Sequence, residues 1–455
     1  MSEIDILKPL KLKASYKDYI WGGEKLRIKY GKITDINPLA ESWELSCHKE
    51  GLSMIDEGDG VKTLASYIKE NPACLGTLCK GDELPILIKL IDAHENLSVQ
   101  VHPNDEQAKK WEKQNGKTEM WYVVQADKDA KITFGVKKDI TKAELENAIK
   151  ENSVEELLNT VPSKKGDVFF VEAGTIHAIG KGNVIAEIQQ SSNITYRLYD
   201  YGRIGKDGRT RELHIEKGVK ASICQRTEPR KIPTCSDGTR LLGSCEYFAV
   251  KELKFSGSNS FNADEKSYHA LIVTEGKAEL KTENYCEVIK TGETVFIPAS
   301  LGKYDLFGKA TILIVTNQPN YYIGIDLSGT NIAAAVVDEN GLIYGRVSRK
   351  TNAPRPYTEI FYDMAECAKE AAEESGLTFA DIKSVVIRCP GVIERETCNV
   401  EFSNNLGFSD VPIVSFMENL LGKKVYVEND ANAAAWGKIS CRKWQRNSQH
   451  GNDNS

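Results

Sequence analysis

Short runs in which apolar and polar residues alternate, separated by turn residues, fill residues 1–135 and resume at Gly166. This period of two is typical of β strands that bury one face. Between these runs, residues 139–159 show helical spacing, and Thr141 with Glu144 three positions later forms a capping-box pattern at the start. The pattern therefore predicts a mainly β first part with a small helical insertion.

The pattern changes after residues 317–320, which we interpret as a linker. Candidate strands and one candidate helix then alternate, at residues 321–331, 332–337, 358–375, 384–387 and 425–427. This alternation is typical of an α/β unit.

An internal repeat links two of the β segments. Residues 292–300 repeat the pattern of residues 166–174, but no histidine stands at the place of His177. A polar stretch at 225–240, which contains Pro229 and Pro233, separates the two copies. We therefore expect a second β barrel without a metal; the alternative is two unrelated strand-turn units.

Four polar side chains in otherwise apolar runs form a candidate metal site. Gln100 and His102 are two positions apart, so on a strand both side chains leave the same face. Glu119 begins an apolar run in which a carboxylate is costly unless it is paired or bound to metal. His177 ends the run that begins at Gly166. Two imidazoles, a carboxylate and an amide oxygen on adjacent strands suit zinc with an open position, whereas a lone histidine is more often a satisfied structural residue.

The spacing of the His177 segment resembles the second motif of cupin barrels, with Glu172 in place of the usual proline. Gln100-x-His102 replaces the His-x-His of the first cupin motif, as in type I phosphomannose isomerases. Residues 19–23, 41–46 and 189–201 also match that family. The chain thus resembles the short bacterial form of zinc-dependent mannose-6-phosphate isomerase over about its first 318 residues.

This resemblance implies interconversion of mannose 6-phosphate and fructose 6-phosphate by zinc-assisted proton transfer through an enediol(ate). It implies one Zn²⁺ per chain, held by His102, Glu119, His177 and, as a fourth ligand, Gln100. Arg197 resembles the family's catalytic arginine, whose permanent charge would stabilise the enediolate or orient its oxygens. The alternative for this residue is a strand-surface arginine paired with Asp200.

Four further residues are second-tier candidates. Lys117 and Glu187 are candidates for acid/base chemistry or phosphate contact, and Ser98 and Lys89 for the lining of the phosphate pocket. Any of the four could instead be a salt-bridge partner. The sequence does not identify the residue that removes the carbon proton.

Residues 322–436 resemble the start of a ROK-family sugar kinase. Asp326, Gly329 and Thr330 lie in a segment similar to the actin-like phosphate loop, and Asp430 matches the base that accepts a sugar hydroxyl proton. For Gly329 and Thr330 alone, the alternative is an ordinary hairpin turn. The second lobe of that family has no counterpart, so we expect a vestigial kinase segment. The polar tail 437–455 lacks periodicity, and we interpret it as frame-shifted or disordered.

These patterns predict two cupin-type jelly-roll barrels followed by a partial α/β actin-like lobe. The expected domains are a catalytic cupin domain with a helical insertion, a second metal-free cupin-like domain, a truncated ROK lobe and the tail, at residues 1–240, 241–318, 319–436 and 437–455. Besides the isomerase, two alternatives stay open: a bifunctional isomerase and ATP-dependent sugar kinase, and a non-catalytic sugar-binding cupin.

Composition limits the partners. Charged residues make up 27% and the formal net charge is −6, which argues against nucleic-acid binding through a basic field. No apolar run approaches the roughly 18 residues of a membrane span. The eleven cysteines are scattered without a C-x-x-C pair, and the N-terminus lacks a signal-peptide core, so we expect a cytoplasmic protein with reduced thiols. The expected partner is a small-molecule sugar phosphate; the oligomeric state does not follow from sequence.

Overall fold

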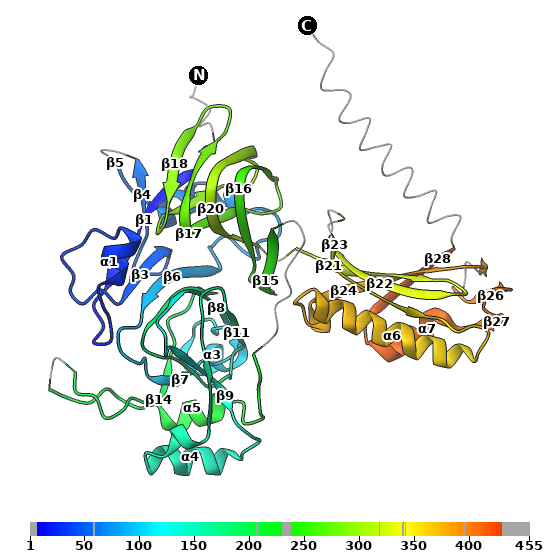
Figure 1. Ribbon diagram of the computed structural model, residues 1–455, viewed down its shortest axis with the longest axis horizontal. Helices are drawn as coiled ribbons and strands as arrows, with labels where there is room; N and C mark the ends of the chain where they lie inside the picture. The colour runs from blue at the N-terminus through cyan, green and yellow to red at the C-terminus, as the bar shows by residue number, and fades with distance from the viewer. Residues whose placement is uncertain are drawn as a thin grey trace, which may run out of the picture. The chain divides into compact units, whose positions relative to one another are not determined.

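A computed structural model describes residues 7–57, 60–205, 208–229, 238–317, 319–338, 341, 343–394 and 397–429. These residues belong to two compact units, Met1–Gln318 and Pro319–Ser455. The first unit contains three sheets with short helices, and the second contains two sheets of its own with two helices (Figure 1). The prediction of a mainly β fold is confirmed.

The central sheet of the first unit has six strands and is buried on both faces. Its order is β11 (Val168–Val171), β8 (Glu119–Ala126), β13 (Asn183–Gln190), β6 (Ile86–Asp92), β3 (Glu41–Leu45) and β2 (Ser15–Lys17). Every residue of β6 is buried, because alternate side chains enter two different cores. A strand buried on both faces reads as a continuous apolar run rather than as an alternating one.

A five-stranded sheet faces the central sheet and closes the first barrel. Its order is β10 (Leu158–Pro162), β9 (Lys131–Val136), β12 (His177–Ile179), β7 (Val99–Val101) and β14 (Tyr196–Tyr199). The barrel core combines side chains of both sheets, among them Trp121, Phe134 and Phe169. The outer face of this second sheet is covered by α3 (Asp105–Glu112), α4 (Lys142–Lys150) and α5 (Ile215–Ala221).

The predicted helical insertion is shorter than expected. Helix α4 begins after Thr141, whose capping box with Glu144 is present as predicted. The helix ends at Lys150, and Asn152 adopts a left-handed conformation (φ 57°). A short 3-10 turn and strand β10 occupy residues 154–162 instead.

The second barrel recruits strands from the start of the chain. Its nine-stranded sheet follows the order β15 (Thr239–Cys245), β16 (Phe248–Ala263), β20 (Gly302–Thr316), β17 (His269–Lys281), β19 (Thr294–Ile297), β1 (Leu10–Lys13), β4 (Met54–Glu57) and β5 (Gly60–Thr63), with β18 (Cys286–Lys290) beside β17. Leu10 lies opposite Phe296 and Leu12 opposite Thr294. Residues 10–63 thus supply three strands of the sheet that we expected residues 241–318 to form alone.

Two further helices, α1 (Lys25–Tyr30) and α2 (Leu64–Glu70), contribute buried leucine and isoleucine side chains to the core between the central sheet and the nine-stranded sheet. This core also contains Leu10, Ile88 and Phe248. The central sheet is consequently held between the two other sheets of the unit.

The second unit contains a five-stranded sheet in the order β23 (Ile343–Lys350), β22 (Asn331–Asp338), β21 (Tyr321–Leu327), β24 (Ile382–Cys389) and β28 (Lys424–Asn429). Strands β21, β24 and β28 run parallel. Helices α6 (Tyr357–Glu374) and α7 (Ile413–Leu421) cover one face, and a small sheet is formed by β25 (Val392–Ile393), β26 (Val400–Ser403) and β27 (Phe408–Val411) (Figure 1). The expected tail 437–455 lies outside the described residues.

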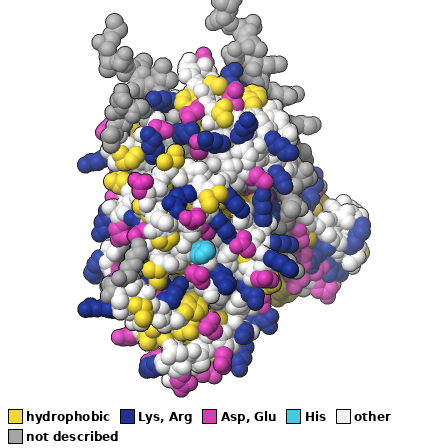
Figure 2. Space-filling view, turned by 60° about the vertical axis from the view of Figure 1, so that its left-hand side comes forward, with side chains coloured by type: hydrophobic (Ala, Val, Ile, Leu, Met, Phe, Trp, Pro, Cys, Tyr) yellow, Lys and Arg dark blue, Asp and Glu magenta, His cyan; other side chains and the backbone are white. Residues whose placement is uncertain are grey.

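Lys and Arg side chains are interspersed with Asp and Glu across the face in view in Figure 2. This face therefore presents no extended field of one sign. Among the described helices, none is long and apolar enough to cross a bilayer.

Candidate active site and metal centre

His102, Glu119 and His177 come together inside the first barrel although they lie on different strands. His102 follows β7 and His177 begins β12, which pairs with β7 so that His177 lies opposite Gln100. Glu119 begins β8 in the facing central sheet. The cluster therefore spans the barrel between its two sheets, whereas the sequence interpretation placed all the ligands on adjacent strands.

A tight turn just before His177 is hydrogen-bonded to the backbone of His102. The Gly174 N–H donates a hydrogen bond of 2.8 Å to the His102 carbonyl. Gly174 has φ +91°, a conformation that residues with a Cβ rarely adopt. This glycine therefore fixes the chain three residues before His177.

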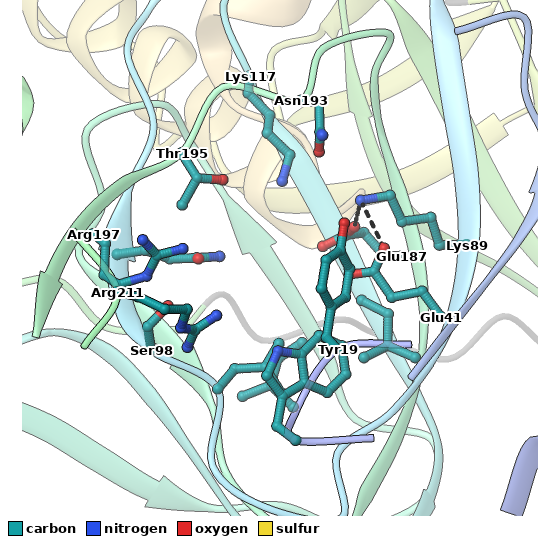
Figure 3. A pocket seen from close by; sticks show the side chains of 15 residues that line it. Tyr19, Glu41, Lys89, Ser98, Lys117, Glu187, Asn193, Thr195, Arg197 and Arg211 are labelled. Atoms are coloured by element: carbon teal, nitrogen blue, oxygen red, sulfur yellow. Dashed lines mark ion pairs between the residues drawn. The ribbon is translucent and has the colours of Figure 1, made fainter. Parts of the chain in front are cut away.

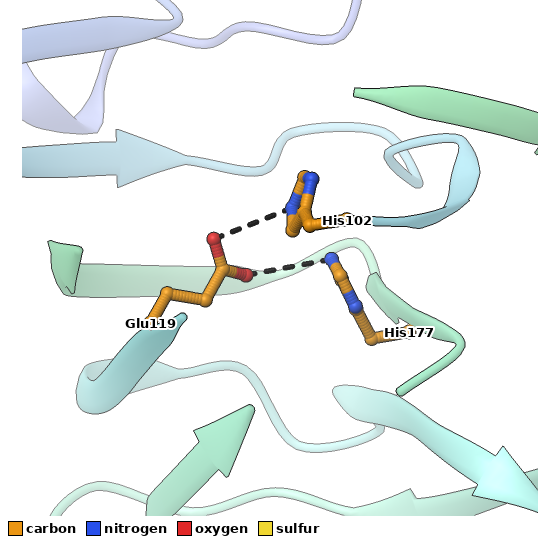
Figure 4. A group of neighbouring side chains, drawn as sticks. All are labelled: His102, Glu119 and His177. Atoms are coloured by element: carbon orange, nitrogen blue, oxygen red, sulfur yellow. Dashed lines mark ion pairs between the residues drawn. The ribbon is translucent and has the colours of Figure 1, made fainter. Parts of the chain in front are cut away.

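The donor atoms are spaced as a small cation requires. Oε2 of Glu119 lies 3.4 Å from Nε2 of His102, and Oε1 of Glu119 lies 3.4 Å from Nε2 of His177 (Figure 4). Tetrahedral ligands at about 2.0–2.1 Å from zinc lie roughly 3.3–3.4 Å from one another. The amide nitrogen of Gln100 lies 3.3 Å from Nε2 of His177, so this side chain reaches the cluster.

Both imidazoles are oriented by their other ring nitrogen. Nδ1 of His102 lies 2.7 Å from the Ile194 carbonyl, and Nδ1 of His177 lies 2.8 Å from the Thr175 carbonyl. A carbonyl only accepts, so each Nδ1 carries the proton and each Nε2 lone pair faces the cluster. Burial, together with the nearby Lys117 ammonium, lowers the pKa of His102 to about 3, which keeps its ring neutral.

Glu119 is the anionic member of the cluster. It is completely buried, and among the described residues neither carboxylate oxygen accepts a hydrogen bond of good geometry. Burial alone would raise its pKa, but Lys117, 2.8 Å away, and the two histidines outweigh burial and hold the pKa well below the usual value. A buried, ionised carboxylate with unsatisfied oxygens fits a bound cation.

A cavity of about 270 Å³ adjoins this cluster. Gln100 and Lys117 belong to both, because they line the cavity and also contact the cluster. The remaining candidates from sequence, namely Lys89, Ser98, Glu187 and Arg197, all line the same cavity (Figure 3).

Lys89 and Glu187 form one wall of the cavity. The Lys89 ammonium lies 3.3 Å from Glu187 and 3.5 Å from Glu41, and all three side chains are buried. Burial raises the pKa of Glu187, and repulsion from Glu119 and Glu41 adds to the rise, while Lys117 and Lys89 oppose it. The pKa of Glu187 is thus raised toward neutral pH, which suits a group that accepts and returns a proton.

Arg197, on β14, stands with Arg211 and Ser98 on another side of the cavity (Figure 3). Nη1 of Arg197 donates to the Glu212 carbonyl at 2.9 Å, and its Nε is buried without a hydrogen-bond partner in the described part of the chain. Asp200 instead pairs with Arg203 and with Arg211, whose Nε lies 2.8 Å away. The alternative in which Arg197 is paired with Asp200 is therefore not what the structure shows.

Several cavity residues were missed by the sequence interpretation: Tyr19, Glu41, Asn193, Thr195 and Arg211. Tyr19 and Glu41 belong to segments 19–23 and 41–46, and Asn193 and Thr195 to segment 189–201, all of which resemble the isomerase family in sequence. Trp21 does line the cavity, and Trp43 is fully buried.

In the second unit, Asp326 lies near the end of β21 and its carboxylate is 3.7 Å from Arg388. Gly329 and Thr330 lie in a turn closed by the Ser328 N–H, which donates to the Asn331 carbonyl at 2.9 Å. Asp430 lies outside the described residues.

Comparison with known proteins agrees with the geometry of the first unit. Residues 9–129 match the phosphomannose isomerase type I catalytic domain, and residues 238–317 match the mannose-6-phosphate isomerase cupin domain. The mannose-6-phosphate isomerase ManA of Bacillus subtilis is 37% identical over 312 residues, which cover 68% of this chain and 98% of ManA. The chain belongs to the mannose-6-phosphate isomerase family.

A solved structure of the mannose 6-phosphate isomerase from Bacillus subtilis superimposes with a TM-score of 0.63 at 32% identity. The superposition covers 68% of this chain and 99% of that structure. As a member of this family, the chain is an aldose–ketose isomerase with a buried His-Glu-His cluster that can hold a metal ion.

The second unit has different relatives. Residues 322–451 match the ROK family, and this match extends into the tail that we interpret as frame-shifted or disordered. A glucokinase of Streptomyces coelicolor is 38% identical over 117 residues, which amount to 26% of this chain and 34% of the glucokinase. This mannose-6-phosphate isomerase family member thus carries a segment related to about a third of a sugar kinase.

Proposed function

We propose that the first unit interconverts mannose 6-phosphate and fructose 6-phosphate, with one zinc ion held by His102, Glu119, His177 and Gln100. The observation that carries this proposal is that the metal-capable cluster and the cavity share Gln100 and Lys117. A substrate in the cavity would therefore lie beside the metal ligands. Zinc, when bound, would supply a Lewis acid for the negative charge that develops on the sugar oxygens.

Glu187 is the proposed group that transfers the proton. Isomerisation moves a proton between adjacent carbons of the open-chain sugar through an enediol(ate), and this requires a group that accepts and returns the proton. Glu187 is suited to this role because its pKa is raised by burial and by the neighbouring carboxylates. The Trp121 indole N–H donates to Oε1 of Glu187 at 3.0 Å, which leaves Oε2 directed toward Lys89.

The arginine side provides the anion contacts. Arg197 has free donor capacity at Nε and would stabilise the enediolate oxygens. Arg211 and Ser98 are the proposed anchors of the substrate phosphate: Nε and Nη2 of Arg211 pair with Asp200, which holds the guanidinium at the cavity so that its other edge can donate a charge-assisted bond. Lys89 is less available for phosphate, since two carboxylates already surround it.

The test is a coupled assay on the purified full chain with mannose 6-phosphate, before and after exhaustive chelation, alongside elemental analysis of bound metal. We expect turnover that needs metal and about one zinc per chain. His177→Ala should lose metal and turnover together, whereas His94→Gln, at an exposed histidine outside the cluster, should retain both. Turnover that survives in verified metal-free protein would refute the zinc-assisted mechanism, and sugar-phosphate binding without turnover would favour the non-catalytic cupin.

A second activity, ATP-dependent sugar phosphorylation, is favoured only by the ROK match and by the turn at Gly329. The matching residues correspond to 34% of the glucokinase. We propose that this unit does not phosphorylate sugars by itself, because closing over a nucleotide and a sugar needs more of the kinase than this segment.

A further inference from the structure

The segment Glu41-Ser42-Trp43-Glu44 on β3 presents two different polar faces. On one face, the Trp43 indole N–H donates to the Glu41 carboxylate at 2.7 Å, and Glu41 lines the cavity. On the other face, Ser42 donates to Glu44 at 2.5 Å, and Glu44 pairs with Lys32 at 2.6 Å. The same strand therefore carries one carboxylate toward the candidate active site and another away from it.

Glu41 and Glu187 are placed in matching ways around Lys89. One carboxylate accepts from the Trp43 indole and the other from the Trp121 indole, at 2.7 and 3.0 Å. The Lys89 ammonium lies between them, at 3.5 Å from Glu41 and 3.3 Å from Glu187, and 5.0 Å from the centre of the Trp43 ring. One buried cation is thus shared by two buried carboxylates.

This sharing has a consequence for Glu187. If Lys89 had a single carboxylate neighbour, the two would be drawn into a close ion pair, because attraction between buried charges is strong. With Glu41 present, the Lys89 ammonium stays 3.3 Å from Oε2 of Glu187, and this buried oxygen accepts no hydrogen bond of good geometry among the described residues. It therefore stays available to a proton of the substrate.

We propose that Glu41 is a positioning residue for the isomerase reaction: fixed by Trp43, its carboxylate holds the Lys89 ammonium between two anions and keeps Glu187 from being captured by it. This inference rests on the proposed isomerase function.

The test compares Glu41→Gln with the wild-type full chain in the mannose 6-phosphate assay. Glutamine keeps the shape and can still accept from the Trp43 indole, but it removes the charge. We expect kcat to fall on the order of 10- to 100-fold, as for a displacement of catalytic groups by about 1 Å. KM should stay within about threefold and metal content should not change, because Glu41 contacts neither the arginine side nor the metal cluster.

The pH profile gives a readout that a structural role would not move. The charged groups that face Glu187 are Lys117, Glu119, Lys89 and Glu41. Glu41 raises the pKa of Glu187, so removing its charge and drawing Lys89 closer should lower that pKa, and activity should persist to a lower pH on the acidic side. Glu41→Asp, which restores the charge, should return the profile toward that of the wild type.

Glu44→Gln is the matched control, since it makes the same chemical change on the opposite face of the same strand. We expect it to lower the unfolding temperature while kcat and the pH profile stay native. Native kcat and profile in Glu41→Gln would overturn the proposal, as would an equal loss in Glu44→Gln. If Glu41→Gln does not fold, Trp43→Phe decides: a lower kcat at unchanged KM supports the role, and native kcat overturns it. An inactive wild-type chain would instead refute the isomerase function itself.

Discussion

Arg197 offers the sharpest test of the proposed chemistry, because its donors can be counted. Nη1 is engaged by the Glu212 carbonyl at 2.9 Å, and Nε is buried without a partner in the described part of the chain. Nε and the outer Nη2 are therefore the groups that can reach a substrate oxygen. A hydrogen bond to a charged group contributes about 1.5–3 kcal/mol.

We expect Arg197→Ala to lower turnover by about 10²–10³, equivalent to roughly 2.7–4 kcal/mol, which is the usual effect of losing an oxyanion donor. If Arg197 acts on the enediolate, kcat and kcat/KM should fall by similar factors; if it binds only the ground-state phosphate, KM should rise at nearly constant kcat. Arg197→Lys keeps the charge but loses the fork, so it should recover part of the activity.

The assay is steady-state isomerisation with parallel determination of zinc per chain. Zinc should remain near one, because Arg197 is not a member of the metal-capable cluster. Arg226→Ala is the matched control, since that arginine is exposed and pairs with Glu228. Near-native turnover in Arg197→Ala would show that the residue is structural and that the assignment is wrong.

Three further outcomes are expected. Burial lowers the pKa of His269 to about 4, so the unfolded chain binds its proton more readily, and stability is retained above pH 6.5 and lost as pH falls toward 4. In urea denaturation, the free energy of unfolding of the wild type should therefore fall by about 2 kcal/mol between pH 7.5 and 5 relative to that of His269→Asn. Parallel pH dependences of the two proteins would contradict this. Residues 1–318 alone should fold and isomerise mannose 6-phosphate, because they form one compact unit with its own cores, and an insoluble or inactive fragment beside an active full chain would disprove it. The second unit of this chain should not phosphorylate glucose, fructose or mannose with ATP, because its match covers 34% of the glucokinase, and product formation in a radiolabelled phosphate-transfer assay would contradict this.

The metal cluster could be predicted because local spacing carries its signal. Gln100 and His102 are two positions apart on a strand, and Glu119 is a carboxylate in an apolar run, so each pattern is recognisable within a few residues of sequence. The positions of Glu41 and Arg211 could not be predicted in the same way. Glu41 reaches the cavity because β3 pairs with β6 in one register, and Arg211 because it lies in a loop tied to Asp200.

The same reasoning explains why the sequence did not place the first strands in the second barrel. The alternation of Leu10 and Leu12 predicts a strand, but no feature of residues 10–13 indicates that this strand pairs with β19. Strand pairing over such a distance in sequence is decided by the packing of whole sheets, here by the core that Leu10 shares with Phe248 and Phe296. The repeat formed by residues 166–174 and 292–300 predicts two barrels, but it does not indicate which other strands complete the second barrel.

The charges around the cavity indicate how a sugar phosphate would lie in it. On one wall, Lys89 is outnumbered by Glu41 and Glu187, so this region repels an anion. On the other side, one buried aspartate, Asp200, is shared between two arginines, and Arg197 adds a third guanidinium. We therefore expect the phosphate at the arginine side and the carbons that exchange the proton between Glu187 and the metal cluster. In the reverse orientation, the phosphate dianion would lie against two buried carboxylates. This repulsion favours the orientation in which the phosphate contacts the arginines.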